Sequence, residues 1–473
     1  MIEMTLAELA RVTGGVVHGD PALVVDAAAY VDNRAPVEGG LFVAVVGERV
    51  DGHDFAAGAH AVLGSRPTAA PTVVVADPTV ALGRLARHVV DRLDVVVHAM
   101  TGSQGKTGTK DLLAHVLAGA GPTVATSANN NNELGVPLTV LRADVTTAHL
   151  VVEMGARGIG HIAYLTDVAP PRVAAVLNVG TAHIGEFGGT AAIAAAKGEI
   201  VEALEESGTA VLNADDPLVA AMAARTRARV LTFGERGEVS WRGVELDDLG
   251  RPSFELGHDG AWAPVALRQT GAHQVANAAA AAAMALAAGL SVGEVAQRLS
   301  GAESASRWRM ELSERPDGLL VLNDAYNANP ASVRAAIDAL AGLGRSRAGR
   351  TLAVLGEMRE LGDQHDAGHR EVGRAAAEAG IDVVVVVGDA AHGIAAGVRE
   401  AAGASEVIVT AGRYDAAAWV RKNAGAADVV LVKASRAAAL EQVAEHLLAD
   451  HDPPATPHGT GTSPPTERNT TPP

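Results

Sequence analysis

The chain has 473 residues, of which 48% are hydrophobic and 20% charged, with a formal net charge of −17 and no cysteine. This length predicts about three domains of ~150 residues each, and the apolar fraction is sufficient for a globular core. The negative charge, without a Lys/Arg cluster, argues against nucleic acid and anionic membranes as main partners. The absence of cysteine excludes disulfides, thiol catalysis and cysteine-ligated zinc.

The sequence has no targeting or membrane-spanning pattern. The N-terminal stretch MIEMTLAELARVTGG carries Glu3 and Glu8 and lacks the apolar centre of a signal peptide. The longest apolar run, residues 278–290, is mostly alanine and is shorter than the ~18 residues that a membrane span requires. We therefore expect a cytoplasmic, monomeric protein without membrane insertion.

Residues 1–78 are expected to form a small α/β domain. Short helix and strand patterns alternate there between polar, glycine-rich loops, and Asp77-Pro78 marks the end of the unit. The expected elements are a helix at residues 5–12 and strands at 41–46 and 72–75. A further helix at residues 79–93 is predicted to lead into the next domain.

Residues 94–117 have the pattern of a nucleotide-binding phosphate loop. A buried strand is followed by a loop with Gly102 and Gly105, then by Lys106, Thr107 and apolar residues at helical spacing. The glycines let backbone N–H groups close around phosphates, and the helix N-terminus adds a positive dipole. Lys106 would reach the β- and γ-phosphates, and the Thr107 hydroxyl would bind Mg²⁺. The usual pattern has a further glycine where this chain has Met100. The alternative is a turn that merely contains Gly-Lys-Thr.

The central region, residues 79–310, is expected to be a phosphate-loop ATPase domain with a mostly parallel sheet. Strand and helix patterns alternate along it, which places the ligand at the carboxyl ends of the strands. The expected strands are 149–153, 173–178, 210–213 and 229–233, the expected helices are 191–206 and 272–288, and residues 239–268 are expected to add antiparallel strands.

Several residues could bind a metal ion. Glu153 ends a predicted strand beside the phosphate-loop strand and is well placed for Mg²⁺, although a surface carboxylate is the alternative. His183 follows another strand, where a structural histidine is the alternative to a ligand, and Lys197 alone would be interpreted as a solvated helix residue. His365 and His369 lie four apart on a predicted helix, but no third ligand is evident.

Residues 311–450 are expected to form a doubly wound, Rossmann-like C-terminal domain. Its predicted strands are 319–322, 351–355, 383–387, 407–409 and 429–432, with helices between them. Lys433, Ser435 and Arg436 follow the last strand and are expected to open a helix, which would make an anion-binding corner. Residues 451–473 are rich in Pro, Thr and Gly and are expected to be a disordered tail.

Taken together, these motifs resemble those of the Mur ligases, ATP-dependent enzymes that build the peptidoglycan stem peptide. The loop TGSQGKT (101–107) is similar to the family's phosphate loop, which begins Thr-Gly and does not use the earlier glycine. The resemblance spans residues 1–449. The motifs similar to the member that adds D-alanyl-D-alanine to UDP-N-acetylmuramoyl-tripeptide are NNNNELGVPLTVL (129–141), EMGARGIGHI (153–162), HIGEFGG (183–189), AAAKGEI (194–200), NDAYNANPASV (323–333) and LGEMRELGDQH (355–365). LFVAVVGERVDGHDF (41–55) is shared with the diamino-acid-adding member, whose Asp-Asn-Pro-Arg motif is absent here.

The resemblance implies a site for ATP and two Mg²⁺ ions. The residues that it implies for ATP are Thr101, Gly102, Ser103, Gln104, Gly105, Lys106, Thr107, Asn277, Arg309 and Asp324. Thr107 and Glu153 would hold one metal ion, and His183 with a carbamylated Lys197 would hold the second. The catalytic residues would be Lys106, His183 and Lys197.

The resemblance also implies substrate contacts in all three domains. They are Asp32, Asn33 and Arg34 for the UDP end, with Asn131, Asn132, Tyr326, Asn327, Lys433, Ser435 and Arg436 elsewhere. Three features depart from the family pattern: Asn33 replaces a serine, Lys433–Arg436 reads KASR where the family has Lys-Gly-Ser-Arg, and the segment after Phe55 is too short for the usual helix.

The implied reaction is ATP-dependent ligation of D-alanyl-D-alanine to the tripeptide through an acyl phosphate, in peptidoglycan precursor synthesis. Another amide ligase of the superfamily, of the diamino-acid-adding or folylpolyglutamate type, is the nearest alternative. A nucleotide-binding regulator without chemistry is a second alternative. Lys106, Glu153, His183 and Lys197 together argue against the regulator, because nucleotide binding alone does not require the last two. The sequence leaves open whether the tripeptide ends in meso-diaminopimelate or L-lysine.

Overall fold

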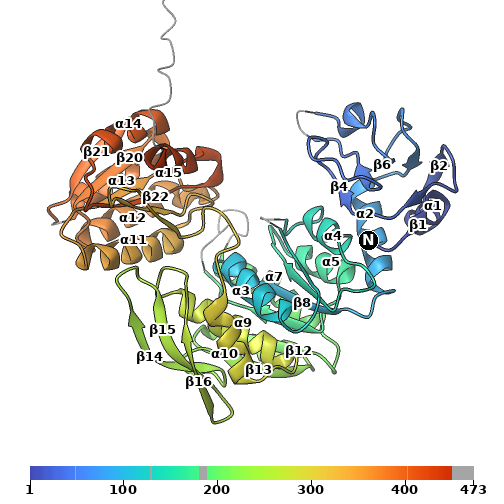
Figure 1. Cartoon of the computed structure of the whole chain (residues 1–473), viewed down its shortest axis with the longest axis horizontal. Coiled ribbons are helices and arrows are strands. Elements are labelled where there is room, and N and C mark those ends of the chain that lie inside the picture. The colour runs from blue at the N-terminus through green and yellow to red at the C-terminus, as the bar shows by residue number, and fades with distance from the viewer. Residues whose placement is uncertain (48–49, 128–129, 181–188, 402, 450–473) are drawn as a thin grey trace, which may run out of the picture.

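The computed structural model describes residues 1–47, 50–127, 130–180, 189–401 and 403–449. The chain forms three α/β domains, with the N-terminal and C-terminal domains on opposite sides of the central one (Figure 1). This agrees with the predicted fold class, and the exact domain boundaries stay predictions. None of the described helices is long and apolar enough to cross a membrane. Two expectations, His183 and the tail at 451–473, lie outside the described residues.

The N-terminal domain is built on a small mixed sheet. The strand order is β2-β7-β6-β5-β4, and every pairing is parallel except that of β2 with β7. The elements are β1 (Met4–Thr5), α1 (Leu6–Thr13), β2 (Val16–His18), β3 (Val24–Val25), β4 (Ala29–Tyr30), β5 (Leu41–Val43), the 3-10 helix η1 (Gly52–Phe55), β6 (Ala61–Gly64) and β7 (Thr72–Val74). The strand expected at 41–46 ends at Val43, because the Val45 carbonyl accepts a hydrogen bond from Gly52 N–H (2.9 Å) in the following loop.

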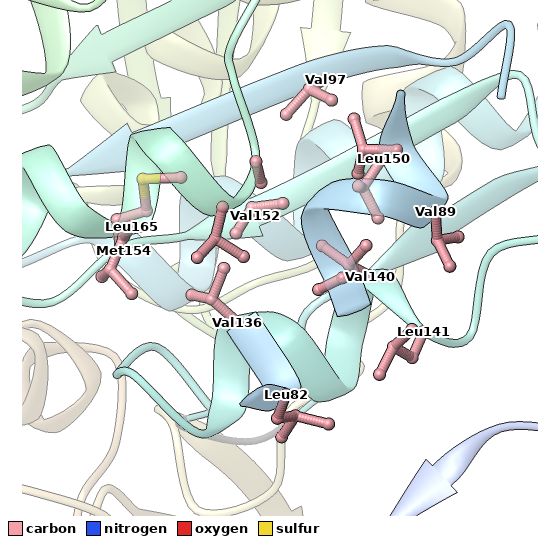
Figure 2. Packing of buried hydrophobic residues seen from close by; sticks show 14 of the residues in the cluster. Leu82, Val89, Val97, Val136, Val140, Leu141, Leu150, Val152, Met154 and Leu165 are labelled. Atoms are coloured by element: carbon pink, nitrogen blue, oxygen red, sulfur yellow. The ribbon is translucent and has the colours of Figure 1, made fainter. Parts of the chain in front are cut away.

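Helix α2 (Pro78–Val90) joins this domain to the central one. Asp77 caps it by accepting hydrogen bonds from the N–H groups of Thr79 (2.8 Å) and Val80 (3.1 Å). Its apolar face, which includes Leu82 and Val89, packs into the core that both domains share, together with β8, β10, α4 and α5 (Figure 2). The helix is therefore a shared structural element and not an exposed linker.

The central domain contains a fully parallel six-stranded sheet in the order β13-β12-β11-β8-β10-β9. Its strands are β8 (Val96–Thr101), β9 (Thr123–Ala125), β10 (His149–Glu153), β11 (Val173–Val176), β12 (Thr209–Asn213) and β13 (Arg229–Phe233). Its helices are α3 (Lys106–Ala118), α4 (Gly135–Val140), α5 (His161–Val168), α7 (Thr190–Glu202), α8 (Pro217–Ala220), the 3-10 helix η2 (Ala221–Arg225), α9 (Gln274–Ala287) and α10 (Val292–Gly301). Helices α2, α4, α5 and α7 cover one face of the sheet, and α3, α9 and α10 cover the other.

The expected antiparallel addition is present. Strands β14 (Ser240–Leu246), β15 (Pro252–His258) and β16 (Ala261–Ala266) form a separate antiparallel sheet, seen at the lower left in Figure 1, beneath the C-terminal domain. The alanines at 278–283 in α9 are fully buried, and their small side chains let α9 pack closely against α3. The helix expected at 191–206 ends at Glu202, and the following turn is closed by a hydrogen bond from Gly208 N–H to the Glu205 carbonyl (2.9 Å).

The C-terminal domain is a doubly wound sheet in the order β17-β18-β22-β19-β20-β21, with only β17 antiparallel. Its strands are β17 (Glu311–Glu314), β18 (Leu320–Asn323), β19 (Thr351–Leu355), β20 (Val383–Val387), β21 (Glu406–Thr410) and β22 (Val429–Lys433). The α-helices are α11 (Pro330–Arg345), α12 (His365–Glu378), α13 (His392–Glu400), α14 (Arg413–Asn423) and α15 (Glu441–Leu448), and the 3-10 helices are η3 (Gly362–Gln364), η4 (Asp389–Ala391) and η5 (Arg436–Ala438). Helices α11–α13 pack on one face, and α14 and α15 on the other. Residues after Lys433 form the short η5 and not the expected α-helix, because Ala439 adopts a left-handed conformation (φ 53°) before α15 begins.

Candidate active site

The phosphate loop runs from the end of β8 to the start of α3, as expected. Gly105 has φ 80°, and a Cβ atom there would lie 2.5 Å from Asn277 Oδ1, so only glycine fits this position. The Lys106 ammonium folds back over the loop and donates to the Gly102 carbonyl (2.6 Å). Burial lowers the pKa of Lys106, an effect that the Glu153 carboxylate opposes.

Asn178 fixes the shape of this loop and was missed by the sequence analysis. It follows β11, and its Oδ1 accepts hydrogen bonds from the N–H groups of Ser103 and Gln104, both at 3.0 Å. Its amide donates back to the Gln104 carbonyl (3.1 Å). A polar residue just after a strand next to β8 was the only signal that could have identified it.

Glu153 and Thr107 lie side by side at the carboxyl edge of the sheet. The Thr107 hydroxyl donates to Glu153 Oε2 (3.0 Å), and the Asn131 amide donates to Glu153 Oε1 (2.8 Å). Glu153 is only 2% exposed. Asn132 does not join this group, because its Oδ1 accepts from Gly135 N–H (2.9 Å) at the start of α4.

Lys197 is buried in α7 and is not the solvated lysine that its helix position alone suggested. It is 5% exposed, and the structure gives its ammonium no hydrogen bond or ion pair among the described residues. Burial lowers the pKa of Lys197 well below its ordinary value, and the neighbouring Lys106 ammonium lowers it further. Burial and the neighbouring ammonium thus both disfavour the charged form of Lys197.

Asn277 contacts the other side of the phosphate loop. It lies on α9, donates to Gln274 Oε1 (2.9 Å), and its amide group borders both Gly105 and Gly108. The structure thus brings Asn277 to the loop from a segment far away in the sequence.

The segment that connects the central and C-terminal domains places Arg309 near the carboxyl edge of the central sheet. Its neighbours Trp308 (φ 58°) and Met310 (φ 49°) are both left-handed, a costly conformation for large side chains that sets the direction of the Arg309 side chain between them. The guanidinium stacks on the Tyr326 ring at 4.1 Å, and its buried Nε has no hydrogen-bond partner among the described residues. Asp324 Oδ1 accepts a hydrogen bond from Met310 N–H (3.1 Å). This bond attaches the connecting segment to the C-terminal domain.

The Lys433 side chain is buried in the C-terminal domain and forms its hydrogen bonds there, so it is not exposed to solvent. Its ammonium forms a buried ion pair with Asp324 and donates to the Asn327 carbonyl (2.9 Å). The Ser435 hydroxyl accepts from Arg359 N–H (2.9 Å), and Arg436 pairs with Glu441 (2.6 Å). These predicted substrate residues are thus grouped at the carboxyl end of β22.

A cavity of about 830 Å³ lies between α3 and the connection at 301–309. Thr107, Arg309 and Tyr326 line it together with Lys110, whose buried ammonium donates to the Thr126 carbonyl (2.9 Å) and pairs with Asp111 (2.5 Å). The sequence analysis did not single out Lys110, because its sequence context is that of an ordinary helix lysine. The cavity is lined both by the phosphate-loop helix and by the first residues of the C-terminal domain, so these two parts of the chain belong to one site.

The residues expected at the UDP end lie near a smaller cavity of about 200 Å³. Asp32 lines it together with Asn130 and Arg142 of the central domain. Arg34 forms an exposed ion pair with Asp32 (2.6 Å), and Asn33 is exposed. Arg142, which donates to Ser127 Oγ (2.7 Å), was missed by the sequence analysis.

The pair His365 and His369 is not a metal site. His369 Nε2 accepts from Met358 N–H (2.9 Å), and its Nδ1 lies 2.7 Å from the His365 carbonyl, so both ring nitrogens are used. Among the described residues, no group of three potential acidic, histidine or cysteine ligands is assembled.

Comparisons with known proteins agree with this architecture. Residues 100–285 match the model of the Mur ligase middle domain, and residues 308–436 match the model of the Mur ligase, glutamate ligase domain. The chain is 45% identical to the UDP-N-acetylmuramoyl-tripeptide--D-alanyl-D-alanine ligase of Mycobacterium tuberculosis, over 95% of this chain and 98% of that protein.

Two solved structures share the whole fold. A crystal structure of MurF from Acinetobacter baumannii is 32% identical with a TM-score of 0.84, over 94% of this chain and 99% of that one. The MurF ligase from Thermotoga maritima in complex with ADP is 30% identical with a TM-score of 0.77, over 89% of this chain and 97% of that one. The chain belongs to the Mur ligase family, in the group of the UDP-N-acetylmuramoyl-tripeptide--D-alanyl-D-alanine ligases.

Proposed function

We propose that this chain is the ATP-dependent ligase that joins D-alanyl-D-alanine to UDP-N-acetylmuramoyl-tripeptide in peptidoglycan precursor synthesis. The observation that carries the proposal is the arrangement at one edge of the central sheet. Lys106, the Thr107–Glu153 pair and the buried Lys197 meet there, and the cavity that Thr107 lines extends to Arg309. Such a site can hold a triphosphate and stabilise charge on its terminal phosphoryl group.

ATP is assigned to the phosphate loop. The matched T. maritima ligase holds ADP, and the loop here has the same strand–glycine–lysine–helix order that suits phosphates. The adenine contact is assigned to Asn277, which borders Gly105. Further ATP contacts are assigned to Arg309 on the connecting segment and to Asp324 of the C-terminal domain.

The chain's residues fit a magnesium ion beside Thr107. Glu153 is a buried carboxylate whose oxygens contact only a hydroxyl and an amide, so its charge lacks a cationic hydrogen-bond partner among the described residues. Hydroxyl and carboxylate oxygens are ligands that Mg²⁺ prefers. Thr107 and Glu153 would hold one ion, His183 and Lys197 a second, and the ions would neutralise phosphate charge.

For that second ion we assign a carbamate on Lys197. A buried ammonium beside Lys106 would repel both that lysine and a cation, whereas a neutral amine reacts with CO₂ to give an anionic oxygen ligand. Burial and the neighbouring Lys106 both lower the pKa of this lysine, which favours the proton loss that carbamate formation requires.

In the reaction, the γ-phosphoryl group of ATP moves to the terminal carboxylate of the tripeptide and gives an acyl phosphate and ADP. The dipeptide amine then attacks the acyl carbon, and phosphate leaves as the amide forms. Lys106 stabilises charge on the transferred group.

The dipeptide is assigned to residues grouped on the C-terminal domain, so this domain has to close over ATP. They are Tyr326, Asn327, Lys433, Ser435 and Arg436. Asp32, Asn33, Arg34, Asn131 and Asn132 are assigned to the UDP-tripeptide.

The domain boundaries assigned here are 1–78, 79–310 and 311–450, and the enzyme is assigned as a cytoplasmic monomer.

Phosphate release tests the function directly. With UDP-muramoyl-tripeptide and ATP·Mg²⁺, we expect rapid release only when D-alanyl-D-alanine is added. Release that depends on a free diamino acid or on glutamate in its place would contradict the assigned amine substrate.

A further inference from the structure

Helix α7 carries a second buried charged residue that the proposed chemistry does not use. Glu199 is 8% exposed and lies two residues after Lys197. Two residues correspond to about 200° of rotation around a helix, so the two side chains leave α7 on nearly opposite sides. Lys197 is close enough to Lys106 for their charges to interact, while Glu199 contacts α5.

Glu199 takes the place of a missing helix cap on α5. That helix begins after Gly160, which has φ 88° and no side chain to cap the free N–H groups. Glu199 Oε1 accepts from Gly160 N–H (2.6 Å), and Oε2 accepts from Ala163 N–H (3.0 Å). A carboxylate at a helix N-terminus also interacts favourably with the helix dipole.

The segment that Glu199 holds is the one that leaves Glu153. Residues 154–160 connect the end of β10 to α5 without regular structure. Its start is fixed by hydrogen bonds from Met154 N–H to the Met100 carbonyl (2.8 Å) and from Gly155 N–H to the Asn131 carbonyl (2.7 Å). Its end is fixed by Glu199. The carboxylate therefore links the helix that carries Lys197 to the segment that directly follows Glu153.

A second contact holds α7 on another side. The Arg225 guanidinium donates to the carbonyls of Ala194 (3.1 Å) and Ala195 (2.8 Å), in the space left by Gly198. Arg225 thus holds one side of α7, and Glu199 supplies hydrogen bonds that join α7 to the start of α5 beside their apolar packing.

We propose that Glu199 is a positioning residue that sets the separation between the Glu153–Thr107 pair and Lys197. This inference rests on the proposed function, since it requires both groups to bind metal ions. Removing a residue that orients metal ligands typically weakens metal binding or activity by ~10–100-fold. Glu199→Gln is the informative change, because the amide keeps the volume but turns an NH₂ group towards one of the two N–H donors.

Asp428 offers a matched control in the C-terminal domain. It is 5% exposed, and its carboxylate likewise accepts from two backbone N–H groups, those of Arg350 (2.7 Å) and Gly425 (2.9 Å). Asp428→Asn therefore removes a similarly buried charge that accepts two backbone N–H groups, at a place remote from Lys197, and it also removes an ion pair with the Arg350 guanidinium (3.0 Å). Any effect shared by the two variants reports stability alone.

The test counts Mn²⁺ ions by electron paramagnetic resonance on the full chain with a non-hydrolysable ATP analogue and bicarbonate. We expect two ions in the wild type and in Asp428→Asn. In Glu199→Gln we expect an unchanged first ion, a second ion weakened ~10-fold or more, and a weaker ¹³C carbamate signal at the same bicarbonate concentration. Glu199→Asp, which keeps the charge on a shorter side chain, should fall between them and carries the test if the glutamine variant does not fold.

Two results would overturn the inference in distinguishable ways. Wild-type Mn²⁺ affinities and a full carbamate signal in Glu199→Gln, with only a lower melting temperature, would make Glu199 a purely structural cap. A wild-type protein that itself binds one ion and shows no carbamate would overturn the two-metal part of the proposed function as well.

Discussion

The Thr107 hydroxyl donates a hydrogen bond to Glu153 Oε2 at 3.0 Å, across 46 residues of sequence. Thr107 lies in the first turn of α3, and Glu153 ends β10, which pairs in parallel with the phosphate-loop strand. The contact exists because parallel strands bring their carboxyl ends to one edge. It joins the phosphate loop to the residue assigned to its metal ion.

Lys106→Ala is expected to lower turnover by ~10²-fold or more, because it removes the cation at the transferring phosphate. The melting temperature should change little, since the one hydrogen bond of this side chain within the described part of the chain goes to the loop carbonyl of Gly102. Steady-state kinetics at saturating ATP measure the effect, and Lys422→Ala, an exposed lysine on α14, is the control. Near wild-type turnover would defeat the assignment of the phosphate loop.

Lys197→Ala is expected to be nearly inactive yet folded, and to regain some activity when acetate supplies the missing carboxylate. Lys197→Arg keeps the positive charge but does not form a carbamate, so it should be just as inactive and acetate should not restore it. Turnover with and without acetate distinguishes the variants. An active arginine variant would show that the lysine acts as a cation and would contradict the carbamate.

The buried His98, which contacts the half-buried His149, should make stability depend on pH. Burial and the neighbouring His149 lower the pKa of His98 from 6.5 to about 3. Above pH 6.5 the folded and unfolded chains both keep this histidine neutral, and it contributes no pH dependence. Below pH 6.5 only the unfolded chain takes up the proton, so the free energy of unfolding should fall by up to ~1.4 kcal/mol per pH unit.

His98→Leu removes this titration. The melting temperatures of the two proteins, measured from pH 7.5 to 5, should therefore shift in favour of the variant as the pH falls below 6.5. Parallel profiles would show that His98 gains a proton in the folded state at the same pH as in the unfolded chain.

Two helical glycines should respond oppositely to alanine. At Gly397, in α13, a Cβ atom would lie 2.0 Å from the Arg370 carbonyl of α12, so Gly397→Ala should destabilise the protein by roughly 1–3 kcal/mol. At Gly293, in α10, a Cβ atom would meet nothing within 4 Å, so Gly293→Ala should stabilise it by about 0.5–1 kcal/mol. Denaturant unfolding of both variants tests this, and equal effects would contradict the close packing of α12 on α13.

The strands and helices with strong apolar patterns were predictable from the sequence. The strands at 149–153, 229–233, 351–355 and 383–387 have the predicted bounds. In the last two, residues 352–355 and 383–387 are continuous apolar runs, as burial on both faces of a sheet requires. Four short strands of the N-terminal domain, of two or three residues each, were missed, namely β1, β2, β3 and β4. They are too short to show a period, and their pairing partners decide their structure.

The candidate site was partly predictable for a related reason. Lys106, Thr107 and Glu153 belong to local patterns whose strand and loop context the sequence contains. The burial of Lys197, the cap that Glu199 makes on α5 and the contact of Asn178 with the phosphate loop depend on long-range packing. No periodicity or spacing encodes such contacts, so a helix lysine and a helix glutamate look solvated until the tertiary structure is known.

The most direct test of the ligase assignment follows an oxygen atom. UDP-muramoyl-tripeptide labelled with ¹⁸O in its terminal carboxylate is incubated with the chain, ATP·Mg²⁺ and D-alanyl-D-alanine, and both products are analysed by mass spectrometry. Formation and breakdown of an acyl phosphate predict the UDP-muramoyl-pentapeptide together with released phosphate that carries one ¹⁸O. Unlabelled phosphate, or phosphate release without the pentapeptide, would contradict the account.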